Sequence, residues 1–177
     1  MASKFVGDFY MGVDLGKLQD YSAVAVVKRE RNSIKLVMAM EFPLETPYSH
    51  VIGFVVRANK KFCFRKILID KSGVGEAVME EIKTQGLTNA EGITLSVQSK
   101  AEMLAYLRLK MEQDKFKMPY NYRLCQQINE QQYEYTKSGQ LRFWHQAGSH
   151  DDQLWALTLA VFATKGKEPE GIMLKAW

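Results

Sequence analysis

Residues 9–15 read FYMGVDL, a short apolar run that closes with an aspartate and leads to Gly16. Residues 22–28 (SAVAVVK) are rich in small and β-branched side chains, and residues 33–41 (SIKLVMAME) alternate apolar and polar ones. Both patterns are typical of strands, and the charged link at residues 29–32 is as short as a hairpin loop. The chain therefore opens as a predicted antiparallel meander of three strands.

Helices and strands are predicted to alternate beyond this meander. Five segments have the apolar spacing or terminal signals of helices, at residues 47–60, 75–85, 99–114, 120–131 and 151–165. Short strands at residues 66–70 (KILID) and 93–97, and a hairpin over residues 134–144, complete the pattern. Thr46 is the predicted cap of the first helix, and Ser99 with Glu102 form a predicted capping box at the third. The last helix should bury one apolar stripe.

This order of elements predicts an α/β fold built on one mixed sheet with helices on both faces. A right-handed crossover would return the strand at residues 66–70 to lie parallel beside residues 9–15. Asp14 and Asp70 would then be neighbours at the carboxyl ends of their strands, where sheets of this type carry their sites. The length fits one average domain, and no linker or repeat divides it, so residues 1–177 are expected to form a single domain.

The composition excludes several classes of protein. Hydrophobic residues make up 46% of the chain and charged residues 25%, which indicates a globular core rather than a disordered or fibrous chain. The net charge of +4 is compatible with a polyanionic partner and too small to identify one. Cys63 and Cys125 stand alone, which argues against a zinc site. The apolar runs are too short for a membrane span and no signal peptide is evident, so the protein should stay in the compartment where it is made, without membrane contact.

Acidic residues mark three of the predicted elements. Asp14 and Asp70 lie at strand ends, and Asp151 and Asp152 begin the last helix. Carboxylates gathered at a sheet edge lose hydration unless positive charge meets them, and no lysine or arginine is placed to serve all three segments. Hard oxygen ligands suit Mg²⁺ or Mn²⁺, and two such ions about 3.5–4 Å apart support phosphodiester cleavage. Mutual repulsion should also leave some of these acids protonated at unusually high pH.

Each acid also has a plain structural interpretation. A single aspartate after a strand is commonly a turn residue, and Asp151 or Asp152 alone would commonly cap a helix. Their joint occurrence in this topology favours a metal site. Asp20, in the first turn, either forms that turn or helps to organise the site. The nearest cations in the sequence are Lys17 and Lys71.

Three segments carry a resemblance to a known family. The sequences GVDLGKLQDYSAVAVV (12–27), LIDKSGVGEAVMEEI (68–82) and SHDDQLWALTLA (149–160) resemble successive motifs of the nuclease domain of large terminase subunits, the DNA-packaging proteins of tailed phages. The stretch between the last two (103–144) resembles the helix, proline-containing connection and hairpin of that family. The resemblance covers the chain from about residue 10 to 163. It implies a ribonuclease-H-like fold and metal-dependent endonuclease cleavage of double-stranded DNA during genome packaging.

The resemblance also implies roles for individual residues. The family's first metal-binding acid falls on Asp14, its second on Asp70, and the acids of its HDD element on Asp151 and Asp152. Asp14, Asp70 and Asp151 would be catalytic, and all four acids would bind two ions of Mg²⁺ or Mn²⁺. Which of the adjacent pair binds metal directly stays open, because neighbouring helical side chains diverge by roughly 100°. His150 matches the motif histidine and either assists near the site or serves in capping or packing.

The family resemblance suggests partners and location as well. Double-stranded DNA would be the substrate, and the terminase ATPase domain, the small terminase subunit and the portal protein would be partners in the cytoplasm of the bacterial host. Family members normally carry the ATPase motor before this domain. This chain has no GxxxxGK[ST] phosphate-binding loop, so we expect an isolated nuclease domain without the motor.

Weaker patterns suggest contacts with DNA. Ser72 and Gly73 lie in a predicted strand-to-helix turn, whose backbone amides are suited to receive a phosphate, although a plain turn explains them equally well. Lys100, Lys137 and Arg142 lie on a predicted helix and hairpin, where they are candidates to follow a DNA backbone. Such charges are more commonly just solvated.

Other functions remain open on the sequence. The nearest alternative is a Holliday-junction resolvase-like nuclease of the same fold, which would prefer branched DNA. The segment GVDLG can also open an actin-like or sugar-kinase-type ATPase, but those folds need a second domain and a second phosphate loop. A non-catalytic docking module is the third alternative, and the complete set of acids argues against it.

Overall fold

The computed structural model describes residues 4–16, 20–72, 74–135, 141–144 and 150–165. Within these residues the strands of the main sheet are β1 (Asp8–Asp14), β2 (Ala23–Arg29), β3 (Ile34–Glu41), β4 (Lys66–Asp70), β5 (Ala90–Ile93) and β6 (Phe116–Lys117). Their order across the sheet is β5-β4-β1-β2-β3-β6. The predicted mixed sheet, which begins with a meander, is thereby confirmed.

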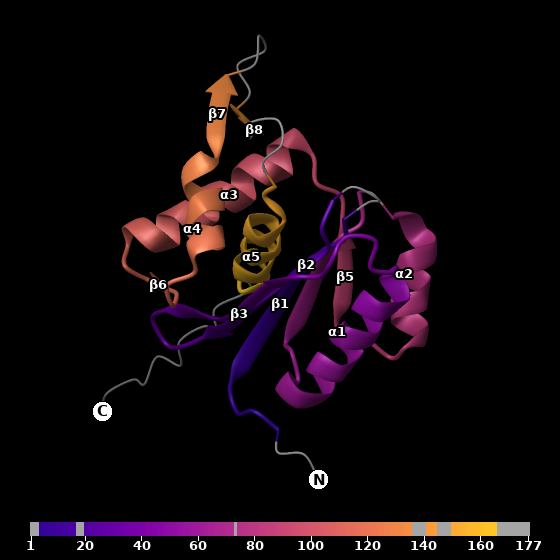
Figure 1. Cartoon of the computed structure of the whole chain (residues 1–177). Coiled ribbons are helices and arrows are strands. Elements are labelled where there is room, and N and C mark those ends of the chain that lie inside the picture. Colours follow the sequence, from indigo (N-terminus) through magenta and orange to yellow (C-terminus); the bar gives the residue numbers. More distant parts are fainter. Residues whose placement is uncertain (1–3, 17–19, 73, 136–140, 145–149, 166–177) are drawn as a thin grey trace, which may run out of the picture.

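The helices in this part of the chain are α1 (Tyr48–Phe62), α2 (Gly75–Thr84), α3 (Val97–Glu112), α4 (Tyr122–Glu130) and α5 (Asp152–Ala163). A separate antiparallel pair, β7 (Gln132–Tyr135) and β8 (Leu141–Trp144), follows α4. Figure 1 shows α1 and α2 on one side of the sheet and α3, α4 and α5 on the other, as predicted. Among the described residues, the helices are all too short or too polar to cross a membrane.

Strand pairing brings two acids together. β1 runs antiparallel to β2 and parallel to β4, and β2 runs antiparallel to β3. Parallel pairing then adds β5 beside β4 and the short β6 beside β3. The register of β1 and β4 sets Asp14 directly opposite Asp70, which confirms the predicted neighbourhood of these two residues.

Each face of the sheet has its own core, because successive side chains of a strand point to opposite faces. On one face Met11 and Val13 of β1 pack with the buried residues of α1 and α2. On the other face Tyr10 of β1 and Ala25 of β2 pack with α3, α4 and α5. The fold thus has three layers, with β1 and β2 at the centre.

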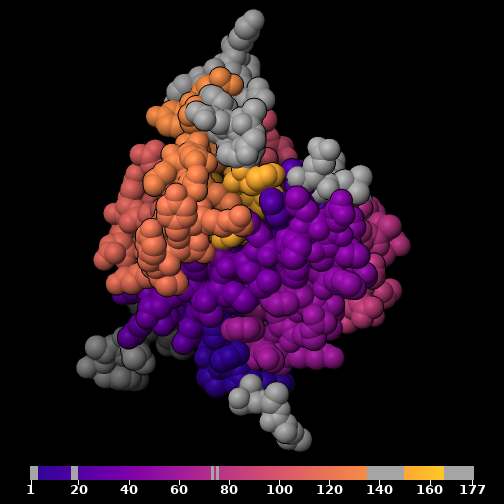
Figure 2. Space-filling model, in the orientation of Figure 1, coloured from indigo at the N-terminus to yellow at the C-terminus, as the bar shows by residue number. Residues whose placement is uncertain are grey.

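α5 is the central element of the second core. Every residue of this helix except Phe162 is buried. The predicted single apolar stripe is therefore wrong: the helix lies between the sheet and helices α3 and α4, and a helix enclosed in this way is apolar on nearly all sides. In Figure 2 the yellow atoms of α5 show only between the orange surface of α4 and the purple N-terminal part of the chain.

Gly12 allows α5 to lie directly on β1. A Cβ atom at this position would stand 2.0 Å from the backbone oxygen of Ala156 and 2.4 Å from the backbone nitrogen of Ala160. Gly12→Ala is therefore expected to push α5 off the sheet and to lower the free energy of unfolding by about 3 kcal/mol, measured by urea denaturation. Gly53→Ala in α1 is the control, since its Cβ would meet only a guanidinium nitrogen of Arg57, at 3.3 Å, and should not destabilise. Equal stability of the Gly12→Ala and wild-type proteins would contradict this close packing.

Two helix starts differ from the prediction. Thr46 does not cap α1, because its hydroxyl donates to the backbone oxygen of Pro43 at 2.6 Å. The capping box of α3 joins Ser96 and Ser99, not Ser99 and Glu102. The Ser96 hydroxyl accepts from the Ser99 backbone N–H at 3.1 Å, and the Ser99 hydroxyl accepts from the Ser96 N–H at 2.8 Å. α3 consequently begins two residues earlier than predicted.

The peripheral strands also differ in detail. The predicted strand at residues 93–97 is misplaced: β5 ends at Ile93, and the following residues run into the cap of α3. The two-residue strand β6 was not predicted. The predicted hairpin is confirmed by the antiparallel pairing of β7 and β8, and residues 136–140 between these strands lie outside the described residues.

Candidate active site

The carboxyl ends of β1 and β4 form the first part of the site. Asp14 and Asp70 are the last residues of these two adjacent strands. Burial raises the pKa of Asp14 well above its ordinary value, and the charges of Asp70, Asp152 and Asp151 raise it further. The electrostatic coupling of Asp14 to all three other acids shows that the fold brings the predicted carboxylates into one neighbourhood.

The start of α5 supplies the other two acids. Asp152 is 7% exposed, and its Oδ2 atom is buried without a hydrogen-bond partner. Burial, followed by the neighbouring charge of Asp151, raises the pKa of Asp152 to about 6, while His150 lowers it. Asp20 and Glu41 also raise this pKa, so both lie close enough to act on the site. The raised pKa values of Asp14 and Asp152 agree with the expectation that some of these acids take up protons at unusually high pH.

Two of the four carboxylates are held by local hydrogen bonds. Oδ1 of Asp70 accepts from the backbone N–H of Ser72 at 2.8 Å and from its hydroxyl at 2.6 Å. Oδ2 of Asp151 accepts from the indole N–H of Trp155 at 2.8 Å. Among the described residues, no three His, Cys, Asp or Glu side chains surround a common point at metal-ligand distance. Binding of an ion would therefore require the acids to move closer to a common point, while the bonds to Ser72 and Trp155 each engage only one oxygen of a carboxylate.

The chemistry of the donor set nevertheless fits a divalent cation. Asp14, Asp70, Asp151 and Asp152 offer hard oxygen atoms, which Mg²⁺ and Mn²⁺ prefer. The buried Oδ2 atom of Asp152 has no hydrogen-bond partner, and the described group nearest to compensating it is the His150 imidazole at 3.8 Å. A divalent ion would offset the cost of burial and relieve the repulsion, which together raise the two shifted pKa values.

A cation that was predicted to follow DNA lies beside this cluster. Lys100 of α3 places its Nζ atom 4.6 Å from the ring centroid of Trp155, and its charge lowers the pKa of Asp14. Of the two cations that the sequence indicated as nearest, Lys71 is paired with Glu76 of α2, and residue 17 is outside the described part of the chain. Among the described residues, Lys100 is thus a cation whose charge acts on Asp14.

The other predicted residues have varied positions. The Ser72 N–H donates to Asp70, and its hydroxyl accepts from the Leu95 N–H at 2.8 Å, so a phosphate would compete with Asp70 for that amide. His150 lies 3.8 Å from Asp152, from Nδ1 to Oδ2, and packs edge-on against Tyr21 with ring centroids 5.0 Å apart. Three predicted DNA contacts lie outside the described parts of the chain: Gly73, Lys137 and the side chain of Arg142.

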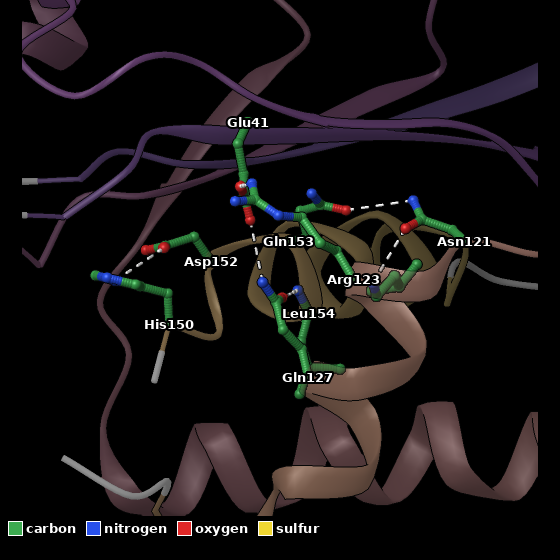
Figure 3. Close-up of polar contacts among 9 residues, drawn as sticks. Glu41, Asn121, Arg123, Gln127, His150, Asp152, Gln153 and Leu154 are labelled. Atoms are coloured by element: carbon green, nitrogen blue, oxygen red, sulfur yellow. Dashed lines mark hydrogen bonds and ion pairs between the residues drawn. The ribbon is translucent and has the colours of Figure 1, made fainter. Parts of the chain in front are cut away.

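Sequence reasoning missed a polar group behind the acids, formed by Glu41, Arg123 and Gln127 (Figure 3). Glu41 is the last residue of β3 and forms an ion pair with Arg123 of α4. Its Oε1 atom also accepts from Nε2 of Gln127 at 3.0 Å. The sequence did contain a signal for Glu41, because this acid ends the third predicted strand. In the sheet Glu41 pairs with Ala23 of β2, and Ala23 pairs with Asp14 of β1, so the three residues lie in one row.

A three-stranded meander, parallel strands joined to its first strand and acids at the adjoining strand ends define a ribonuclease-H-like fold. The family model described as the terminase RNaseH-like domain matches residues 11–164. The chain belongs to this family.

Curated relatives support the same assignment. The large terminase subunit of Thermus phage G20c is 25% identical over 160 residues, which make up 90% of this chain and 32% of the relative. The large terminase subunit of Thermus virus P23-45 gives the same identity and coverage. The chain therefore spans about a third of the length of the curated relatives that it matches.

Solved structures of large terminases share the fold. The large terminase nuclease of phage G20c with bound magnesium superposes with a TM-score of 0.77 at 24% identity, over 90% of this chain and 83% of that one. The large terminase of bacteriophage HK97 gives 0.73 at 12% identity, over 91% and 40%. The nuclease domain of the bacteriophage SPP1 large terminase with bound manganese gives 0.60 at 19% identity, over 86% and 84%.

Proposed function

We propose that this chain is a metal-dependent endonuclease that cleaves double-stranded DNA during packaging of a viral genome. The observation that carries the proposal is the position of the acids: Asp14 lies opposite Asp70 at adjoining strand ends, and Asp151 and the buried Asp152 at the start of α5 lie close enough for their charges to raise the pKa of Asp14. Membership of the terminase family supports it, since structures of related nuclease domains were determined with magnesium or manganese bound.

Asp14, Asp70, Asp151 and Asp152 would hold two ions of Mg²⁺ or Mn²⁺. Bound ions of this kind supply Lewis-acid stabilisation of phosphate charge and an activated water as nucleophile. The chain itself supplies the carboxylates, holds Asp14 at the end of an interior strand and sets Asp152 in a buried position. Lys100 adds positive charge near Asp14, where the phosphate of the substrate would come closest to the acids. Asp20 and His150 are accessory residues in this proposal.

The biological setting belongs to the same proposal. Residues 1–177 would act as one nuclease domain that works with the terminase ATPase domain, the small terminase subunit and the portal protein. Packaging would take place in the cytoplasm of the infected bacterium. The relatives are large terminase subunits about three times the length of the matched region, which supports the idea that a motor accompanies this domain.

Incubation with supercoiled plasmid tests the activity. We expect nicked and linear products with Mn²⁺ or Mg²⁺ and none with a chelator. Preferential cutting of a four-way junction would instead favour a resolvase-like enzyme. Metal-dependent ATP hydrolysis without DNA cleavage would favour the ATPase alternative. No reaction on any of these substrates would favour a docking module.

Binding to DNA should be weak and largely independent of sequence. The chain has a net charge of only +4, so attraction must come from local basic groups that contact phosphates and release counterions. We expect the association constant for a labelled duplex to fall about tenfold or more between roughly 50 and 200 mM salt, measured by fluorescence anisotropy with a chelator present. Tight, salt-insensitive binding to one sequence among several unrelated duplexes would contradict this expectation.

A further inference from the structure

Trp155, near the start of α5, contacts an acid and a cation of the candidate site through different parts of its indole ring. The ring N–H donates to Oδ2 of Asp151 at 2.8 Å. The Nζ atom of Lys100, in α3, lies 4.6 Å from the ring centroid, within the distance at which an aromatic face attracts a cation. Trp155 is only 4% exposed, so its ring is held by the surrounding core. One buried side chain therefore sets the place of the Lys100 ammonium relative to Asp151.

The position of Lys100 is not explained by the stability of its own helix. Ser96 caps α3, so Lys100 lies at the end of the first turn. The N-terminal end of a helix carries partial positive charge, and a cation is unfavourable there. The contact with Trp155, which belongs to another helix, is the interaction that favours the ammonium at this place.

The Lys100 ammonium lies beside the acids without pairing with them. Its charge lowers the pKa of Asp14, yet within the described part of the chain it forms neither an ion pair nor a hydrogen bond. Contact with a ring does not prevent such pairing, because Lys165 lies 4.9 Å from the ring centroid of Phe162 and still pairs with Glu102 at 2.7 Å. The half-buried Lys100 thus offers its charge to an anion that comes from outside.

From these contacts we infer that Trp155 is a positioning residue, which holds the Lys100 ammonium beside the acids to receive a phosphate of the DNA substrate. The inference rests on the proposed nuclease function, because that function makes DNA the anion. Lysine binds phosphate as a point charge on a flexible four-carbon side chain. Without the ring face, that side chain would be free to leave the site or to turn to a carboxylate.

The first test compares Lys100→Met with Lys110→Met. Lys110 is a matched control on the same helix, since it is also half-buried and its Nζ atom lies 4.9 Å from the ring centroid of Tyr106. Fluorescence anisotropy of a labelled duplex, with a chelator present, gives the slope of the logarithm of the association constant against that of the salt concentration. Lys100→Met should reduce the magnitude of this slope by about 0.9, the share of one phosphate contact, and Lys110→Met should not change it. An unchanged slope in Lys100→Met, or no binding of the duplex by the wild type, would overturn the inference.

The second test asks whether Trp155 acts through Lys100. Near roughly 100 mM salt, Trp155→Leu should reduce the affinity for the duplex about fivefold to tenfold, as Lys100→Met should, and the double variant should lose no more than either. Trp155→Phe keeps a ring face and should retain more affinity than Trp155→Leu. Circular dichroism checks the folding, and Trp155→Met, whose unbranched side chain fills irregular space, replaces Trp155→Leu if that variant does not fold. Equal further losses from Trp155→Leu with and without Lys100→Met would show a purely structural role and overturn the inference.

Neither measurement involves cleavage or a metal ion. A wild-type protein that binds the duplex but fails to cut plasmid in Mn²⁺ would contradict the proposed function. Additive losses in the two backgrounds would instead overturn only the role assigned to Trp155, so the two failures are distinguishable.

Discussion

Asp14→Asn is expected to abolish metal-dependent plasmid cleavage while the protein remains folded. Asparagine keeps the shape of the side chain and removes the charge that would hold the ions. Loss of the ion removes several kcal/mol of charge stabilisation, and each step of about 1.4 kcal/mol changes a rate tenfold, so the decrease should reach about a thousandfold. Asp70→Asn should behave in the same way. The measurement is the initial rate of loss of supercoiled plasmid in Mn²⁺.

Asp114→Asn provides the matched control for these variants. Asp114 is exposed. The next residue, Lys115, accepts a hydrogen bond from the N–H of Ile34, which begins β3. Glu41, beside the acids, ends the same strand, so Asp114 lies near the opposite end of β3 from the site. Its φ angle of 53° is a conformation that asparagine accepts readily. Asp114→Asn should cleave like the wild type. Near-wild-type cleavage by Asp14→Asn, with an unchanged circular dichroism spectrum, would refute the assignment of Asp14 to the site.

The metal-free protein should lose stability as the pH rises. The pKa of Asp152 is about 6 and that of Asp14 is also raised, whereas both would titrate near 4 in the unfolded chain. Above pH 4 the folded protein therefore retains protons that the unfolded chain has released, and the free energy of unfolding falls until the folded-state pKa is passed. Below pH 4 the acids are protonated in both states, and this contribution vanishes.

Asp152→Asn should remove part of this pH dependence. We expect the variant to gain about 1–2 kcal/mol in free energy of unfolding relative to wild type at pH 7.5, and little or nothing near pH 4. Urea denaturation at the two pH values, with a chelator present, measures the difference. Asp114→Asn again serves as the control and should show no such pattern. A gain for Asp152→Asn that is the same at both pH values would contradict the raised pKa.

Local patterns were sufficient to predict the centre of the fold. The apolar runs of β1, β2 and β4 are bounded by short charged or glycine-containing turns. Such turns leave few possible ways for these strands to pair. Asp14 and Asp70 are the ends of two such strands, and their neighbourhood follows from parallel pairing alone. Features at the edge of the sheet were harder, because β5 pairs through partly buried residues that carry little apolar signal.

The supporting contacts of the site could not be predicted, because they join residues far apart in the chain. Gln127 bonds to Glu41, 86 residues away, and to Leu154, 27 residues away. Helical spacing places Gln127 on the same face as Leu124 and so separates it from the exposed Gln126, but it does not reveal the partners of Gln127. Asp151 shows the opposite difficulty: its local pattern predicts a helix cap with good reason, and only the tertiary contact of Gln127 with α5 reveals that the cap is supplied elsewhere.

Calorimetric titration of the metal-free protein with Mn²⁺ and Mg²⁺ tests most directly whether Asp14, Asp70, Asp151 and Asp152 form a metal site. We expect one ion to bind more tightly than a second, because the first relieves most of the repulsion among the carboxylates. Mn²⁺ should bind more tightly than Mg²⁺, which demands stricter geometry and dehydrates reluctantly, and Asp14→Asn should remove the tight binding. No binding of either ion, or two equally tight Mg²⁺ sites in the absence of DNA, would contradict the proposed site.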